Sequence, residues 1–224
     1  QACLSGQMDH LSTTPTGAAF HRLLAVVDES WLFFMITNTQ FWWHLARASG
    51  VVAWVLLGLS VMWGILLSSR VLRTIDRPAW LLDLHRWLGT LTWATVGVHL
   101  LCLIFDSYVQ FSIGDLFVPW LSNWKPAPLA WGIFGFYLIV VVQVSSRFMK
   151  RLPHKVWHTV HLLSYPSFAV VSMHSFMAGT DSHRAWFTIC GALLITGLAV
   201  LTLVRIILIR QTSLTSQRRA RAIS

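Results

Sequence analysis

Four histidines lie inside two long apolar stretches of the chain, and their spacing is nearly the same in both. His85 and His99 are 14 residues apart, and His161 and His174 are 13 residues apart. Ionisable side chains are costly inside a bilayer, so each histidine is a candidate functional residue. Neutral imidazole is a good axial ligand of heme iron. The two pairs therefore predict two bis-histidine heme sites.

The spacings also predict how the histidines are paired. They correspond to rises of about 21 Å and about 20 Å along a helix. The stretches are the second and the fourth of the expected helices, so they run in the same direction. His85 then faces His161 near one membrane surface, and His99 faces His174 near the other. Two hemes stacked along the membrane normal, each bound from both sides, suit electron transfer.

The helical phase is regular in the first stretch but not in the second. At about 100° per residue, a 14-residue step is about 40° out of register, whereas a 13-residue step is about 140° out. Pro166 lies between His161 and His174. An internal proline removes a hydrogen bond and kinks the helix, so we expect the phase to change there. His158, one turn before His161, is the alternative ligand.

The composition places the chain among membrane proteins. Of its 224 residues, 55% are hydrophobic and 11% are charged, and the mean hydropathy is +0.62. A membrane-spanning helix needs about 20 mostly apolar residues. The expected fold is an all-α membrane protein, a bundle of about five transmembrane helices enclosing the two hemes. The stretches that meet the length criterion are Phe41–Leu67, His85–Phe105, Pro128–Ser146, Val156–Ala178 and Ala185–Ile209.

Three regions are expected along the chain. Residues 1–40 form an extracytoplasmic or interfacial segment, because the apolar patch Trp31–Ile36 is too short to span a membrane. Residues 41–210 form the heme domain, and residues 211–224 form a basic cytoplasmic tail. Basic residues in short loops mark the cytoplasmic side, which predicts a multi-pass protein of the inner (plasma) membrane with its N-terminus outside. These basic loop residues are Arg70, Arg73, Arg77, Arg147, Lys150, Arg151 and Lys155.

Other chemistries lack support in the sequence. The net charge of +9 comes from short loops and the tail, which favours membrane topology over nucleic-acid binding. Cys3, Cys102 and Cys190 are too widely spaced to suggest a zinc or iron–sulfur site. No glycine-rich phosphate loop follows a candidate strand, so a flavin or nicotinamide donor would have to be bound by a separate protein.

Further residues near the histidines are candidates for contacts with heme. Arg86, Arg184 and Arg147 are placed to pair with heme propionates, and the alternative interpretation is that they are membrane anchors. Trp93 and Phe168 lie near the midpoints of the two histidine pairs, so either ring is a candidate to fill the space between the hemes. Core packing is the alternative interpretation for both rings.

Two segments carry a family resemblance, LHRWLGTLTWATVGVHL at 84–100 and VWHTVHLLSYPSFAVVSMHSFMAGTDS at 156–182. They resemble the ferric reductase-like transmembrane family, which includes the membrane part of NADPH oxidases, yeast-type ferric reductases and the heme subunit of bacterial methionine sulfoxide reductase systems. The resemblance covers roughly residues 41–210. It implies that His85 and His161 hold an inner heme b, and that His99 and His174 hold an outer one. Because no flavin domain follows the last helix, the sequence looks like the short bacterial members.

The resulting expectation is a membrane oxidoreductase that acts as a di-heme b-type cytochrome. It would take electrons from a separate cytoplasmic flavoprotein carrying FAD or FMN. It would pass them to an extracytoplasmic acceptor such as ferric iron, oxygen, quinone or a periplasmic redox protein. One alternative is a histidine-based transporter of protons or metal ions, although no expected helix carries a carboxylate. Another is a heme-bearing membrane anchor for a soluble reductase.

Overall fold

A computed structural model describes residues 39–69 and 79–223 of the protein. Within this part the secondary structure is helical, without a strand, which confirms the expected all-α class. Residues 1–38, which were expected to form an extracytoplasmic or interfacial segment, lie outside the described residues. The same is true of Arg70, Arg73 and Arg77. The helices are α3 (Thr39–Ser68), α4 (Ala79–Phe105), α5 (Ile113–Phe117), α6 (Pro126–Arg147), α7 (His154–His161), α8 (Ser164–Ala178) and α9 (Ala185–Ile223).

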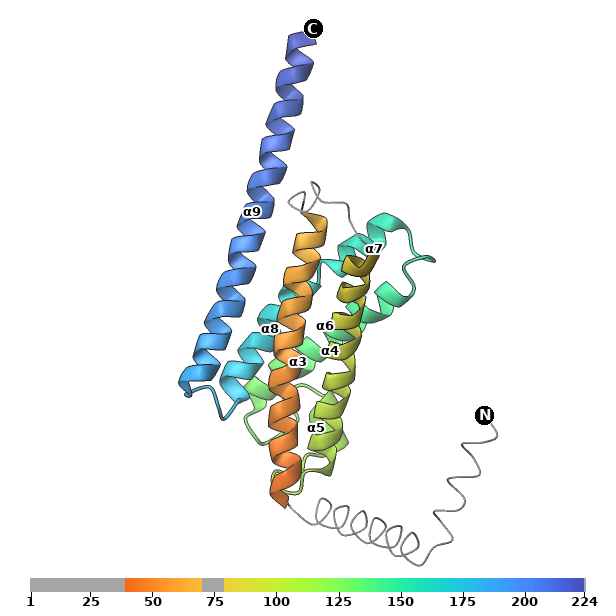
Figure 1. Ribbon diagram of the computed structural model, residues 1–224. Helices are drawn as coiled ribbons and strands as arrows, with labels where there is room; N and C mark the ends of the chain where they lie inside the picture. Colours follow the sequence, from red (N-terminus) through yellow and green to blue (C-terminus); the bar gives the residue numbers. More distant parts are fainter. Residues whose placement is uncertain (1–38, 70–78, 224) are drawn as a thin grey trace, which may run out of the picture.

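The long helices form an up-and-down bundle (Figure 1). Helices α3, α6 and α9 run in one direction, and α4 and α8 run in the other, as the histidine pairing requires. Helix α3 packs mainly on α4, and α6 packs mainly on α8. In contrast, α4 and α8 make little direct contact within the described residues. We name the two ends of the bundle after the histidines that lie there, the His85 end and the His99 end.

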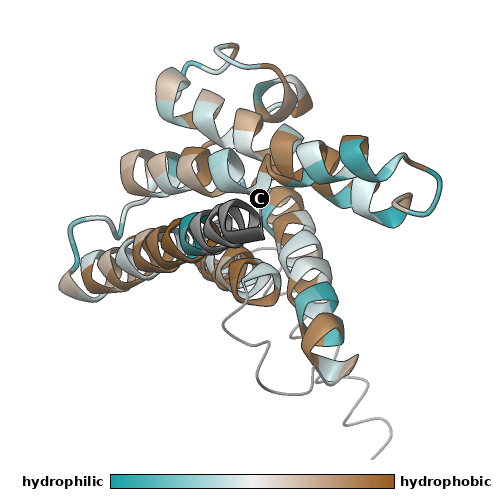
Figure 2. Ribbon diagram, turned by 90° about the horizontal axis from the view of Figure 1, so that it is seen from above, coloured by the Kyte–Doolittle hydropathy of each residue, from teal (hydrophilic) through white to brown (hydrophobic). Residues whose placement is uncertain are grey.

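Four described helices are long and apolar enough to cross a membrane, namely Gln40–Ser68, Ala79–Phe105, Pro126–Arg147 and Ala185–Gln211. Figure 2 shows that hydrophobic residues dominate along much of the bundle, whereas hydrophilic residues gather near loops and helix ends. Three boundaries differ clearly from the expectation. Helix α4 begins at Ala79, six residues before His85. Helix α9 continues past Ile209 to Ile223, and the fourth expected helix is divided into α7 and α8.

The division between α7 and α8 follows from Pro166. Proline has no N–H to donate to the carbonyl four residues earlier, and its ring clashes with that carbonyl. Here the turn tightens instead: Leu163 N donates to Val160 O at 3.0 Å, and Tyr165 N donates to Leu162 O at 3.2 Å. Hydrogen bonds between residues i and i+3 are those of a 3₁₀ turn, in which the chain turns by about 120° per residue rather than about 100°. The predicted kink between His161 and His174 is therefore confirmed.

The helices are held together by an aromatic core next to the histidines. Trp54 of α3 is fully buried, and its indole stacks on Phe187 of α9 with 5.0 Å between ring centres. Its Nε1 donates to Ser172 Oγ of α8 at 2.9 Å. Burying large rings supplies most of the packing energy, and the indole hydrogen bond fixes the rotation of α3 relative to α8.

A second core closes the His99 end. The loop between α4 and α6 places Phe111 and Leu116 against Cys102 of α4 and Ile133 of α6. The short helix α5 within this loop begins with a capping box, in which Ser112 Oγ accepts from Asp115 N and the Asp115 carboxylate accepts from Ser112 N. The loop is thereby fixed as a cover over this end of the bundle.

Candidate heme sites

The first histidine pair meets at the His85 end. The ring centres of His85 on α4 and His161 on α7 are 6.0 Å apart, and the ring planes are inclined by 74°. Metal–nitrogen bonds to histidine are about 2 Å long, so this separation leaves room for one metal ion between the rings. His158 instead stacks on His154, with 6.1 Å between ring centres, on the exposed side of α7. Thus it is His161, not His158, that faces His85.

The second pair lines a cavity at the His99 end. His99 of α4 and His174 of α8 both border this cavity, which has a volume of about 170 Å³ and a mostly apolar lining. Val96, Ile133 and Phe136 are among the apolar residues that surround it. Because α4 and α8 hardly touch, the space between these histidines is a property of the fold rather than of one side-chain rotamer.

Backbone carbonyls of the neighbouring helices orient this second pair. His99 Nδ1 donates to Ala46 O of α3 at 2.7 Å, and His174 Nδ1 donates to Pro128 O of α6 at 2.8 Å. A carbonyl oxygen only accepts, so Nδ1 must carry the hydrogen. Nε2 then keeps its lone pair, which is the arrangement found in metal-binding histidines. A neutral imidazole held in this way would present Nε2 as its free ligand atom.

Glycines make these hydrogen bonds possible. In an α-helix the carbonyl of residue i−4 lies beside residue i, and the Cβ of residue i leans toward it. Gly50 comes four residues after Ala46, and Gly132 comes four residues after Pro128. A Cβ atom at Gly50 would lie 3.0 Å from His99 Cε1. The absence of side chains at these positions gives the rings access to the carbonyls.

The His85 end repeats this arrangement with small residues. A Cβ at Gly64 of α3 would lie 3.2 Å from His85 Cε1, and Ser146 Oγ of α6 lies 3.2 Å from His161 Nδ1. Gly64 follows Gly50 by 14 residues, and Ser146 follows Gly132 by 14 residues. This repeat was a signal in the sequence, because it equals the 14-residue spacing of His85 and His99 and is close to the 13-residue spacing of His161 and His174, yet sequence reasoning missed it.

The residues present fit two heme groups. Heme iron takes its axial ligands from the protein and the rest from the porphyrin, so a pair of imidazoles is the complete protein contribution. Among the described residues, no cluster of three or more His, Cys, Asp or Glu is arranged to hold a metal ion alone. His85 Nδ1 is buried without a hydrogen-bond partner, although the Ser60 backbone is close enough to interact with the ring.

The arginines predicted to pair with propionates lie at the surface. The Arg86 side chain is 62% exposed and pairs with Asp83 at 3.1 Å. Arg147 is exposed at the end of α6. Arg184 is 70% exposed and lies 3.4 Å from Asp181. These three arginines do not border the cavity at the His99 end, and their contact with propionates stays a prediction.

Arg47 is the basic residue that sequence reasoning missed. It lines the cavity together with His99 and His174. Its Nη2 donates to both carboxylate oxygens of Asp181 at 2.6 Å, while its Nε is buried without a partner. The signal was available, because Arg47 lies within the first expected helix, where a charge is costly.

The two aromatic candidates are placed differently. Phe168 is 3% exposed in the aromatic core, and a Cβ at Gly58 of α3 would lie 2.9 Å from its ring. Trp93 is 39% exposed and stacks on Phe136 with 6.2 Å between ring centres. Phe168 is therefore the more central of the two, and a role between hemes stays a prediction for both.

Comparison with known proteins gives one family. The family model described as ferric reductase like transmembrane component matches residues 49–172, more than half of the chain. The match includes His85, His99 and His161, and His174 lies just beyond it. Neither the curated proteins nor the solved structures gave a match.

Proposed function

The chain belongs to the ferric reductase-like transmembrane family, and on that premise we propose that it is a di-heme membrane cytochrome of the b type. The observation that carries the proposal is the arrangement of four histidines as two facing pairs near opposite ends of one bundle. His85 and His161 would hold one heme b, and His99 and His174 the other. Hemes bound there would supply one-electron transfer between the two membrane surfaces.

The protein's own contribution is to hold the histidine rings in a fixed orientation and to surround the sites with apolar residues. Carbonyls of α3 and α6 hold His99 and His174 with Nε2 free of hydrogen. The lining of the cavity at the His99 end is largely apolar, which would favour transfer of electrons without accompanying proton chemistry. Two imidazole ligands per iron leave no open coordination position, which suits electron transfer rather than substrate binding at the iron.

The direction of transfer follows from topology. We place the His85 end in the cytoplasm, because Arg147, Lys150, Arg151 and Lys155 lie there. The donor would be a cytoplasmic flavoprotein that carries FAD or FMN. The acceptor would lie on the His99 side, and ferric iron, oxygen, a quinone or a periplasmic redox protein all meet this requirement.

Heme content is the direct test. We expect the protein, purified in detergent from heme-replete cells, to give a low-spin b-type spectrum and about two hemes per chain in a pyridine hemochrome assay. His85→Ala and His99→Ala should each lower this number to about one. His183→Ala, at an exposed histidine, is the control and should leave it unchanged.

The opposite outcome would be equally clear. A colourless protein, or a heme content that none of the four histidine substitutions changes, would overturn the proposal. Histidine-dependent movement of protons or metal ions in proteoliposomes made from colourless protein would then favour a transporter.

A further inference from the structure

Helix α7 is short and has no buried residue. It has eight residues, His154–His161. Together with the preceding loop it forms an exposed basic surface, which we call the α7 surface and define by Arg147, Lys150, Arg151, His154, Lys155 and His158. Residues 147–163 contain no acidic residue. The one described acid on the neighbouring start of α4, Asp83, is already paired with Arg86.

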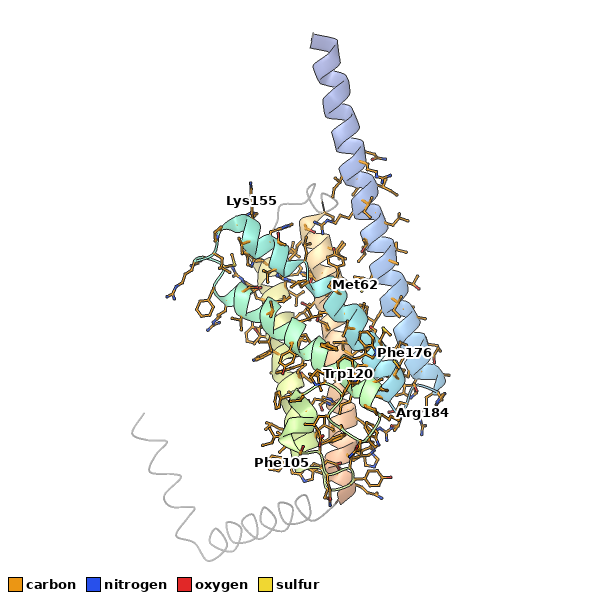
Figure 3. All side chains as sticks on the ribbon, turned by 180° about the vertical axis from the view of Figure 1, so that it is seen from behind. Met62, Phe105, Trp120, Lys155, Phe176 and Arg184 are labelled. Carbon is orange, nitrogen blue, oxygen red and sulfur yellow. The ribbon has the colours of Figure 1, made fainter. Side chains whose placement is uncertain are left out.

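The α7 surface faces away from the bundle. In Figure 3 the side chain of Lys155 points outward beyond one end of the bundle, and Arg184 lies at the opposite end. Lipids surround a membrane protein laterally, whereas a side chain that points along the bundle axis beyond its end faces the aqueous phase. This direction favours a soluble partner over lipid headgroups as the ligand of the α7 surface.

Trp157 connects the α7 surface to the His85–His161 pair. Its ring stacks on His161, with 5.3 Å between ring centres and 26° between planes. The same ring also contacts the exposed His154, with ring centres 5.7 Å apart. Its Nε1 is buried without a hydrogen-bond partner. One indole thus lies between the exposed basic residues and a proposed heme ligand.

We propose that the α7 surface is the docking site for an acidic, one-electron donor protein, and that Trp157 fills the space between the docked donor and His161. This inference rests on the proposed function. In each encounter the donor would lose one electron and a heme held by His85 and His161 would gain it, with no bond formed or broken. A basic surface attracts an acidic partner and speeds its association, and the effect weakens as ionic strength rises.

The first experiment measures docking without relying on heme. The full chain is placed in nanodiscs of neutral phosphatidylcholine and titrated with oxidised flavodoxin, an acidic flavoprotein used as the probe. Binding should weaken by about tenfold or more when salt rises from about 0.02 M to about 0.3 M. The double variant Arg151→Glu/Lys155→Glu should show a comparable loss at low salt, whereas Lys125→Glu, in the loop at the His99 end, should bind like the wild type.

Two results would overturn the docking site. One is a loss of binding in Lys125→Glu as large as in the single variant Lys155→Glu, which changes the net charge by the same amount; net charge alone would then decide. The other is unchanged flavodoxin binding in a double variant that loses only its attraction to anionic vesicles, which would assign the α7 surface to lipid headgroups.

The second experiment concerns Trp157. In Trp157→Leu we expect the rate of heme reduction by flavodoxin hydroquinone to fall severalfold at saturating donor, with flavodoxin affinity and dithionite-reducible heme unchanged. Trp157→Phe keeps a stacking ring and should recover much of the rate. Equal rates in all three proteins would overturn the role of Trp157. Salt-dependent docking to a protein without heme would refute the proposed function while leaving the docking site in place.

Discussion

Gly132 of α6 faces His174 of α8 so closely that a Cβ atom at position 132 would lie 2.7 Å from both Cε1 and Nδ1 of the imidazole. The ring occupies the space that a side chain would take, and its Nδ1 reaches Pro128 O through that space. The position of a proposed heme ligand thus depends on a residue without a side chain on another helix.

The Gly132 contact predicts a loss of heme from the His99 end on adding one methyl group. Gly132→Ala should lower the hemochrome count from about two to about one per chain, because the ring must leave its carbonyl. We also expect a destabilisation of about 1–3 kcal/mol from overpacking. Gly97→Ala is the matched control, since a Cβ at Gly97 meets no atom within 4 Å. Equal heme contents in the two variants would contradict the positioning role.

Two histidines one turn apart on α7 should behave differently. His161→Ala should abolish the heme at the His85 end, because His161 is the residue whose ring lies 6.0 Å from that of His85. His158→Ala should retain both hemes, because this ring is exposed and stacks on His154. Low-temperature absorption spectra and redox titration distinguish which heme is lost. Loss of heme only in His158→Ala would reassign the ligand.

Arg47 should matter more than Arg184, although both pair with Asp181. Arg47→Gln leaves the largely buried carboxylate without its main donor, which we expect to cost about 1–3 kcal/mol of stability. Arg184 is 70% exposed, so Arg184→Gln should change stability by less than about 0.5 kcal/mol. Thermal unfolding in one detergent measures both. Equal effects would show that the cavity-lining pair has no special role.

Pro166 should be required for the geometry of the fourth histidine-bearing segment, not for its helicity. Pro166→Ala restores the missing backbone donor, so helix content measured by circular dichroism should stay the same or rise slightly. A continuous helix would place His161 and His174 about 140° apart in phase. We therefore expect at least one heme to be lost. Full heme content in this variant would show that the interruption after His161 does not depend on the proline.

The sequence alone was sufficient to predict the features that depend on local composition and on the spacing of residues along a helix. The membrane class follows from long apolar stretches, and the pairing of His85 with His161 follows from nearly equal spacings on helices that run in the same direction. The kink was predictable because a missing N–H at Pro166 acts on its own helix. The family was also recognisable from two segments, and the family match at 49–172 confirms it.

Tertiary packing decided the features that depend on helix rotation and on which helices are neighbours. Nothing local shows that Gly132 faces His174, or that Arg47 meets Asp181, which is 134 residues away in sequence. His158 and His161 were both open as ligands because they lie one helical turn apart, and only the placement of α4 distinguishes them. A one-dimensional pattern fixes which side of a helix is apolar, whereas the close packing of side chains between helices fixes which residues meet.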